Sequence, residues 1–240
     1  MKIHLEADAV GAARAGARFI ASIARATVAA RGRFIMAVSG GHDPRRMFRF
    51  LADEEVSWEA VHVVQVDERV APEGDMERNS THLRESLFSR VPLLPEQIHV
   101  MPVEESDLEA AAGKYSQLLR QIAGSPPVLD LVHLGLGPDG HTASLVPGDP
   151  VLEINDRDVA VSEVYQGRLR MTLTYPILNR ARHVLWLVTG SEKAGILGRL
   201  RDSDASIPAS RVMQNVAIVM TDLAAACVTG PEETKGVSCA

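Results

Sequence analysis

The feature that most constrains the fold of this chain is an alternation of short apolar segments with longer helical ones. Six segments rich in valine, isoleucine and leucine are predicted to be strands, at residues 33–39, 61–67, 97–101, 129–136, 183–190 and 215–221. Several are apolar nearly throughout, as parallel strands are when helices cover both faces of their sheet. Between the third and fourth, a helix is predicted to begin at a capping box of Ser106 and Glu109 and to end at Gly124. The alternation therefore predicts a doubly wound, mostly parallel α/β sheet with helices on both faces.

The interval 151–182 departs from this alternation. Its stretches "DVAVSEV" and "RLRMTLTY" alternate apolar with polar residues and lie close together, so we expect a small antiparallel addition around 158–175. No internal repeat or low-complexity linker divides the sequence, and we expect a single α/β domain over 1–230. The last ten residues, 231–240, are predicted to be a flexible C-terminal tail.

The charge balance narrows the classes of partner. A net charge of −6 argues against a general nucleic-acid binder, which normally carries a basic face. Arg14, Arg18 and Arg25 interrupt the alanine-rich segment 9–30, so that segment is not expected to enter a membrane. We therefore expect a soluble protein, a monomer or small homo-oligomer, without nucleic-acid or membrane partners.

Cysteine and histidine usage argues against a metal site and against a disulfide framework. The two cysteines are too few for either a disulfide scaffold or a zinc module, which indicates a reducing compartment and predicts a cytoplasmic protein. No pair of the eight histidines has zinc-ligand spacing, so no metal is expected.

Glycines and polar residues follow the predicted strands, where open parallel sheets bind their ligands. After the first long strand, Ser39-Gly40-Gly41 allows a sharp turn with exposed amides, and Asp43-Pro44 begins a helix. Exposed amides at a helix N-terminus can hold a phosphate. An ordinary tight turn explains this loop equally well when it is considered alone.

Charged residues follow the other strands. Asp67, Glu68 and Arg69 come where the second of these strands gives way to a loop, and they fit either a salt-bridge network or an anion site. Lys193 lies in the first turn of a predicted helix, where a cation is unfavourable unless an anion is bound too. Arg168, which opens "RLRMTLTY", is a further candidate cation.

The stretch "LGLGPDGHTASLVPG", residues 134–148, contains the spacing G-x-G-x-x-G of dinucleotide-binding proteins. That fingerprint requires a long helix after the glycines and an acid at the end of the next strand. Here Pro147-Gly148 breaks the chain, and the nearby acids precede a strand, so dinucleotide binding is not expected. What remains is Asp139-Gly140-His141. A histidine at a strand end can serve as a general base near neutral pH, and a neighbouring carboxylate can orient it.

Taken together in this order, the motifs resemble those of the 6-phosphogluconolactonase family over nearly the whole chain. They are "SGG" followed by proline, "DER", "NS", "GLGPDGHTASLVPG", "RLRMTLTYPILNRA", "TGSEKA" and "PASRV". The resemblance implies hydrolysis of 6-phospho-D-glucono-1,5-lactone to 6-phosphogluconate, in the oxidative pentose phosphate pathway, without metal or organic cofactor. It also implies the Rossmann-like fold shared with glucosamine-6-phosphate deaminases and ribose-5-phosphate isomerases.

The resemblance also implies roles for individual residues. His141 would activate the attacking water, Asp139 would support it, and Arg69 would contact the substrate and its developing oxyanion. Binding of the substrate and its phosphate would fall to Ser39, Gly40, Gly41, Asp67, Arg168 and Lys193. The chain departs from the family at His42-Asp43, where small hydroxyl residues are usual. This departure bears on phosphate binding, because a carboxylate near a phosphate repels it unless it is turned away.

Two alternatives remain at this point. A glucosamine-6-phosphate deaminase or isomerase has a "DGHIAFNEP"-like stretch that supplies an extra acid, whereas Leu145-Val146 stands in that region here. A non-enzymatic domain that senses a sugar phosphate is the second alternative. It is disfavoured because no helix-turn-helix segment precedes the domain and the chain is acidic.

Overall fold

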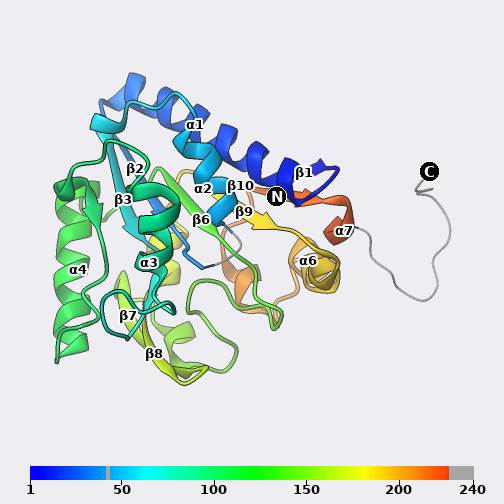
Figure 1. Ribbon diagram of the computed structural model, residues 1–240. Coiled ribbons are helices and arrows are strands. Elements are labelled where there is room, and N and C mark those ends of the chain that lie inside the picture. Colours follow the sequence, from blue (N-terminus) through cyan, green and yellow to red (C-terminus); the bar gives the residue numbers. More distant parts are fainter. Residues whose placement is uncertain (42–43, 227–240) are drawn as a thin grey trace.

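A computed structural model describes residues 1–41 and 44–226 (Figure 1). In these residues seven strands form one sheet in the order β1-β10-β9-β6-β2-β3-β5, and every neighbouring pair is parallel. The strands are β1 (Lys2–Glu6), β2 (Phe34–Val38), β3 (Val61–Gln65), β5 (Ile98–His99), β6 (Leu131–Leu134), β9 (Val184–Val188) and β10 (Ala217–Asp222). The predicted parallel α/β sheet is thereby confirmed. The expected tail 231–240 and the unusual His42-Asp43 lie outside the described residues.

Helices cover both faces of this sheet, and the side chains of β2 alternate between the two resulting cores. Phe34, Met36 and Val38 pack with α1 (Ala9–Arg31) and α2 (Arg45–Ala52). Ile35 and Ala37 point the other way, into the core shared with α4 (Leu108–Ala123) and α6 (Ala194–Arg201). This period of two explains why the strand is apolar throughout. Figure 1 shows α1 and α2 together, away from α4 and α6.

Shorter helical segments connect these elements. They are α3 (Asn79–Leu83), a π-helical turn (Arg84–Phe88), α5 (Tyr175–Leu178), α7 (Leu223–Ala226) and 3₁₀ turns at Trp58–Ala60, Pro95–Gln97, Pro150–Glu153, Ser191–Lys193 and Pro208–Arg211. None of the helices in residues 1–41 and 44–226 combines the length and apolar character that crossing a bilayer requires.

The N-terminus of α4 corrects one expectation. Asp107, not Ser106, caps the helix, because its carboxylate accepts a hydrogen bond of 2.9 Å from the amide of Ala110. Both residue types are good caps, so the sequence pattern alone leaves the choice open within one residue.

A second, antiparallel sheet has the strand order β4-β8-β7, with β4 (Asp67–Arg69), β8 (Arg168–Leu173) and β7 (Val159–Tyr165). The β7–β8 hairpin is the antiparallel addition expected around 158–175. Strand β4 was not expected, because Asp67 was predicted to end the parallel strand 61–67 and a loop was predicted to follow it. Val66 transfers the chain between the sheets. Its amide donates to Val38 in the parallel sheet, and its carbonyl accepts from Leu173 in the antiparallel one. Asp67 and Arg69 are therefore held at the carboxyl end of β3.

Candidate active site

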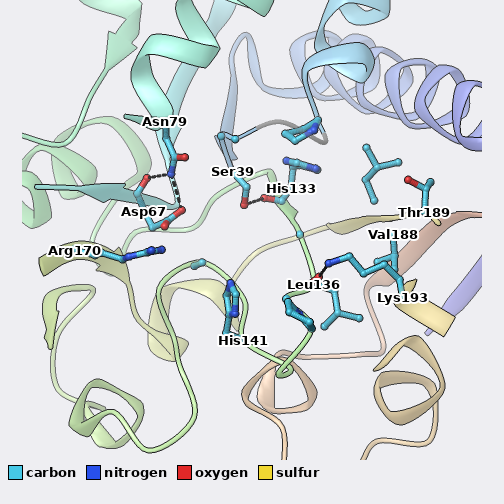
Figure 2. A pocket seen from close by; sticks show the side chains of 18 of the residues that line it. Ser39, Asp67, Asn79, His133, Leu136, His141, Arg170, Val188, Thr189 and Lys193 are labelled. Atoms are coloured by element: carbon cyan, nitrogen blue, oxygen red, sulfur yellow. Dashed lines mark hydrogen bonds between the residues drawn. The ribbon is translucent and has the colours of Figure 1, made fainter. Parts of the chain in front are cut away.

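A cavity of about 320 Å³ opens where β2, β3, β6 and β9 end (Figure 2). The residues after these four strands form much of its wall, as expected for a parallel α/β sheet. Seven residues that were selected from the sequence line it, namely Ser39, Gly40, Gly41, Asp67, Arg69, His141 and Lys193. The cavity thus gathers a histidine, an acid and cations from segments far apart in the chain.

His141 and Asp139 form a close pair at this cavity. The Nδ1 atom of His141 lies 2.6 Å from Oδ1 of Asp139, and the same carboxylate oxygen accepts the His141 amide at 3.1 Å. Asp139 contacts His141 but is not itself among the residues that line the cavity. Burial raises the pKa of Asp139, but hydrogen bonds from His141 and Tyr165 outweigh that effect and bring its pKa below the ordinary value. Asp139 is therefore a carboxylate beside the imidazole at neutral pH.

The glycines of the G-x-G-x-x-G spacing make room for this histidine. A Cβ atom on Gly137 would collide with the imidazole of His141. Gly140 has a φ of +86°, and a Cβ atom there would lie 2.5 Å from the side chain of Ile207. The amide of Gly137 donates to the carbonyl of His141 at 2.9 Å, which closes the loop. The spacing thus serves a tight loop that carries the histidine, and no dinucleotide-binding helix follows it.

The three charged residues of the "DER" motif have different surroundings. Glu68 is fully buried and accepts hydrogen bonds from the amides of Arg69, Asn79 and Ser80. It also pairs with the buried guanidinium of Arg78 at 3.2 Å. Glu68 is therefore part of a structural network that fixes the N-terminus of α3, whereas Arg69 faces the cavity. The salt-bridge interpretation of the motif is thus correct for Glu68, and the anion-site interpretation stays a prediction for Arg69.

Arg69 and Asp67 are oriented by Asn79, which the motif "NS" indicated but which was not selected as a site residue. Nη1 of Arg69 donates to Oδ1 of Asn79 at 2.8 Å, and Nδ2 of Asn79 donates to Oδ1 of Asp67 at 3.1 Å. Ser144 donates to the other oxygen of Asp67 at 2.8 Å. The bond from Arg69 to Asn79 holds the Arg69 guanidinium at the cavity wall. Figure 2 shows the contact between Asn79 and Asp67.

Arg170 lines the cavity, and Arg168 does not. Arg168 stands near the tip of the β7–β8 hairpin, where its guanidinium bonds Glu77 at 2.6 Å and approaches Asp75 at 3.4 Å. Arg170 is two residues deeper in the strand, is 3% exposed, and lies directly opposite Arg69 in the β4–β8 register. Burial and the charge of Arg69 lower the pKa of Arg170. Two facing arginines repel each other, so this position favours a bound anion.

In the view of Figure 2, Lys193 lies on the opposite side of His141 from Arg170. It ends a 3₁₀ turn, Ser191–Lys193, one residue before α6 begins, and its Nζ atom donates to the carbonyl of Leu136 at 2.7 Å. The ammonium is thereby fixed beside the loop of His141.

Gly40 packs so closely on Asn79 that a side chain at this position would collide with it.

His133 is a cavity residue that the sequence did not reveal, because a histidine inside an apolar strand resembles ordinary core. It is 1% exposed, and neither ring nitrogen has a hydrogen-bond partner among the described residues. Burial lowers its pKa to about 3. His133 is therefore a neutral part of the wall. In the described ranges, no three or more histidine, cysteine, aspartate or glutamate side chains are grouped so that they could hold a metal ion.

Comparisons with known proteins agree with the motifs. Residues 7–220 match the model of the family described as glucosamine-6-phosphate isomerases/6-phosphogluconolactonase. The 6-phosphogluconolactonase of Synechocystis sp. is 38% identical over 177 residues, which cover 72% of this chain and 73% of that one. The 6-phosphogluconolactonase of Mycobacterium tuberculosis is 37% identical over 223 residues, covering 88% and 90%. The crystal structure of 6-phosphogluconolactonase from Thermotoga maritima superposes with a TM-score of 0.83 at 26% identity, covering 92% of this chain and 98% of that one.

Proposed function

The chain belongs to the family of glucosamine-6-phosphate isomerases and 6-phosphogluconolactonases, and we propose that it hydrolyses 6-phospho-D-glucono-1,5-lactone to 6-phosphogluconate in the oxidative pentose phosphate pathway. The observation that carries the proposal is the His141–Asp139 pair in a cavity that also contains Lys193, Arg69 and Arg170. A base and several cations suit a neutral ester carbonyl in a substrate that carries a phosphate.

The pair supports a role for His141 as general base. Asp139 accepts a hydrogen bond from the protonated Nδ1 of His141, which leaves Nε2 free to take a proton from water. The water oxygen then bonds to C1 of the lactone, and the carbonyl oxygen becomes an oxyanion, which Arg69 or Arg170 stabilises. When the C1–O5 bond breaks, His141 returns its proton to the ring oxygen and the carboxylic acid product loses its proton to solvent.

The remaining wall residues bind the substrate. Lys193 and the amides of Gly40 and Gly41 hold the phosphate, and Asp67 and Ser39 shape the wall beside the sugar. Arg170 takes the role that the sequence suggested for Arg168, because Arg168 is engaged with two acids outside the cavity. The Nε atom of Arg170 is buried and has no hydrogen-bond partner among the described residues.

The family includes deaminases and isomerases, which need an additional acid for ring opening. The segment after His141 offers hydroxyl groups instead of a carboxylate. Thr142 donates to Gly135 and Ser144 donates to Asp67, so both hydroxyls support the loop and the wall. This difference favours the lactonase over the deaminase, and an assay with glucosamine-6-phosphate distinguishes the two activities directly.

The test of the proposal is the decay rate of freshly generated 6-phosphogluconolactone, corrected for spontaneous hydrolysis. We expect the wild-type protein to accelerate decay and His141→Ala to reduce kcat by about 10²- to 10⁴-fold, the usual contribution of a general base. His4→Ala, which changes an exposed histidine on β1, is the matched control and should retain full activity. Equal corrected rates for the wild type and His141→Ala would contradict the proposal.

We propose in addition that the enzyme works in the cytoplasm as a monomer or small homo-oligomer, with no cofactor and with no nucleic-acid or membrane partner. The net charge of −6 supports the absence of a nucleic-acid partner. Light scattering after size exclusion measures the oligomeric state. An activity assay with and without a chelator tests whether the enzyme needs a metal.

A further inference from the structure

Tyr165 ends strand β7, where the hairpin turns toward β8. The turn residues Gln166 and Gly167 have φ angles of 52° and 80°, which are typical of a tight two-residue hairpin turn. The register of β7 against β8 shifts between Ser162 and Tyr165, as it does at a β-bulge. Bulges change the direction in which a side chain points, and Tyr165 meets the loop of His141.

The phenol of Tyr165 contacts both members of the proposed catalytic pair. Its hydroxyl donates to Oδ2 of Asp139 at 3.1 Å and lies 3.4 Å from Nδ1 of His141. The rings of Tyr165 and His141 meet edge to face, with centroids 5.3 Å apart. The two oxygens of Asp139 thus have different partners, since Oδ1 accepts from His141 and Oδ2 from Tyr165. Burial and the charge of Asp139 raise the pKa of Tyr165, so the phenol keeps the proton that it donates.

We infer that Tyr165 is a positioning residue that locks the carboxylate of Asp139 toward Nδ1 of His141, so that Nε2 of the imidazole faces the substrate. The inference rests on the proposed function and extends it from a pair to a set of three residues. A carboxylate bonded through one oxygen can rotate about its side-chain bonds, whereas bonds to both oxygens fix its plane. An imidazole whose partner is fixed needs less reorganisation during proton transfer.

The ring of Tyr165 has a second task that its hydroxyl does not share. The guanidinium of Arg170 lies over this ring, 4.9 Å from the centroid, and its Nη2 atom approaches the Tyr165 carbonyl at 3.4 Å. Arg170 lines the cavity. Tyr165 therefore connects the base to a substrate-binding cation: the hydroxyl orients the base, and the ring supports the cation.

Substitutions of Tyr165 in the full-length protein can separate the role of its hydroxyl from that of its ring, with the phosphorylated lactone as substrate. In Tyr165→Phe the ring remains and the hydroxyl is lost, so kcat should fall about tenfold, as for a hydrogen bond to a charged group, while KM stays within twofold. In Tyr165→Leu the support for Arg170 is lost too, so KM should rise as well. Tyr175→Phe is the matched control, because it removes a hydroxyl that bonds Pro208 away from the cavity, and its kcat and KM should equal those of the wild type.

A spectroscopic measurement separates positioning from folding and does not depend on the reaction. The proton on Nδ1 of His141, which reports the short bond to Asp139, should exchange faster with water in Tyr165→Phe than in the wild type or in Tyr175→Phe. A wild-type kcat in Tyr165→Phe together with unchanged proton exchange would overturn the inference. That result, with an active wild type and an inactive His141→Ala, would leave the proposed function intact. A wild-type protein without lactonase activity would instead refute the proposed function.

Discussion

At the scale of single residues, each cation of the cavity is held by a contact within the protein. Arg69 donates to Asn79, Lys193 to the Leu136 carbonyl, and Arg170 lies over a tyrosine ring. Ordering long side chains in advance lowers the entropic cost of binding. Because Lys193 is assigned to the phosphate and not to the lactone carbonyl, removing it should affect recognition of a charged substrate more than chemistry at the carbonyl.

Substitution of Lys193 tests this division of roles. In Lys193→Ala, KM for the phosphorylated lactone should rise about 10- to 100-fold, the range for a lost hydrogen bond to a charged group. Glucono-1,5-lactone lacks the phosphate, so its kcat/KM should change little. Lys114→Ala removes an exposed lysine on α4 that pairs with Glu105 and serves as the control. Equal losses for both substrates would show that Lys193 does not bind the phosphate.

At the scale of elements, the loop between β6 and the 3₁₀ turn Pro150–Glu153 decides where the base stands. Its glycines leave space for an imidazole on one side and for Ile207 on the other. The φ angle at Gly137 is not positive, so the backbone there can accept an L-residue without strain. The Cβ atom of such a residue would, however, displace His141. The absence of side chains at these glycines therefore allows the loop to place the His141–Asp139 pair at the cavity.

Gly137→Ala should reduce kcat at least tenfold while the protein stays folded, because a displacement of about 1 Å at a reacting group can cost a hundredfold in rate. Gly113→Ala makes the same chemical change at an exposed position of α4, where a Cβ atom meets nothing within 4 Å. It should leave activity unchanged and stabilise the protein by about 0.5–1 kcal/mol. Steady-state kinetics and urea unfolding of both variants provide the comparison. Full activity in Gly137→Ala would show that the loop adapts.

At the scale of the whole molecule, the buried sheet keeps histidines neutral. Burial lowers the pKa of His133 to about 3, and burial together with the neighbouring His62 lowers the pKa of His99 to about 4. Both folded-state values lie below the unfolded value of about 6.5, so the unfolded chain binds more protons in acid. The stability that depends on these groups is complete above about pH 6.5 and is lost as the pH falls toward their folded pKa values.

The free energy of unfolding should therefore decrease between pH 7.5 and pH 5.5. For the fully buried His133 this contribution is about 1.4 kcal/mol over that interval. His133→Gln, which cannot titrate, should reduce the loss by about that amount, whereas His4→Gln at an exposed position should not. Urea unfolding at the two pH values measures the difference. An unchanged pH dependence in His133→Gln would contradict the assignment.

The sequence by itself determined the parallel sheet, its helical layers and the motif that carries His141. Apolar runs such as 33–39 and 183–190 are long enough, and flanked clearly enough, that local pattern settles their type. Strand ends were less well determined, since 61–67 was expected to be one strand. The chain changes sheets at Val66 because its carbonyl bonds Leu173, more than a hundred residues away, and such a partner leaves no local signal.

Only the tertiary structure decided which charges meet at the cavity. Arg168 and Arg170 have the same chemistry and the same strand alternation in the sequence, yet one bonds Asp75 and Glu77 near the hairpin tip and the other faces Arg69 across the register. Tyr165 reaches Asp139 from a hairpin 26 residues away along the chain. The physical reason is the same in each case: a side chain's role depends on the partners within a few ångströms, and long-range strand pairing, not local pattern, chooses those partners.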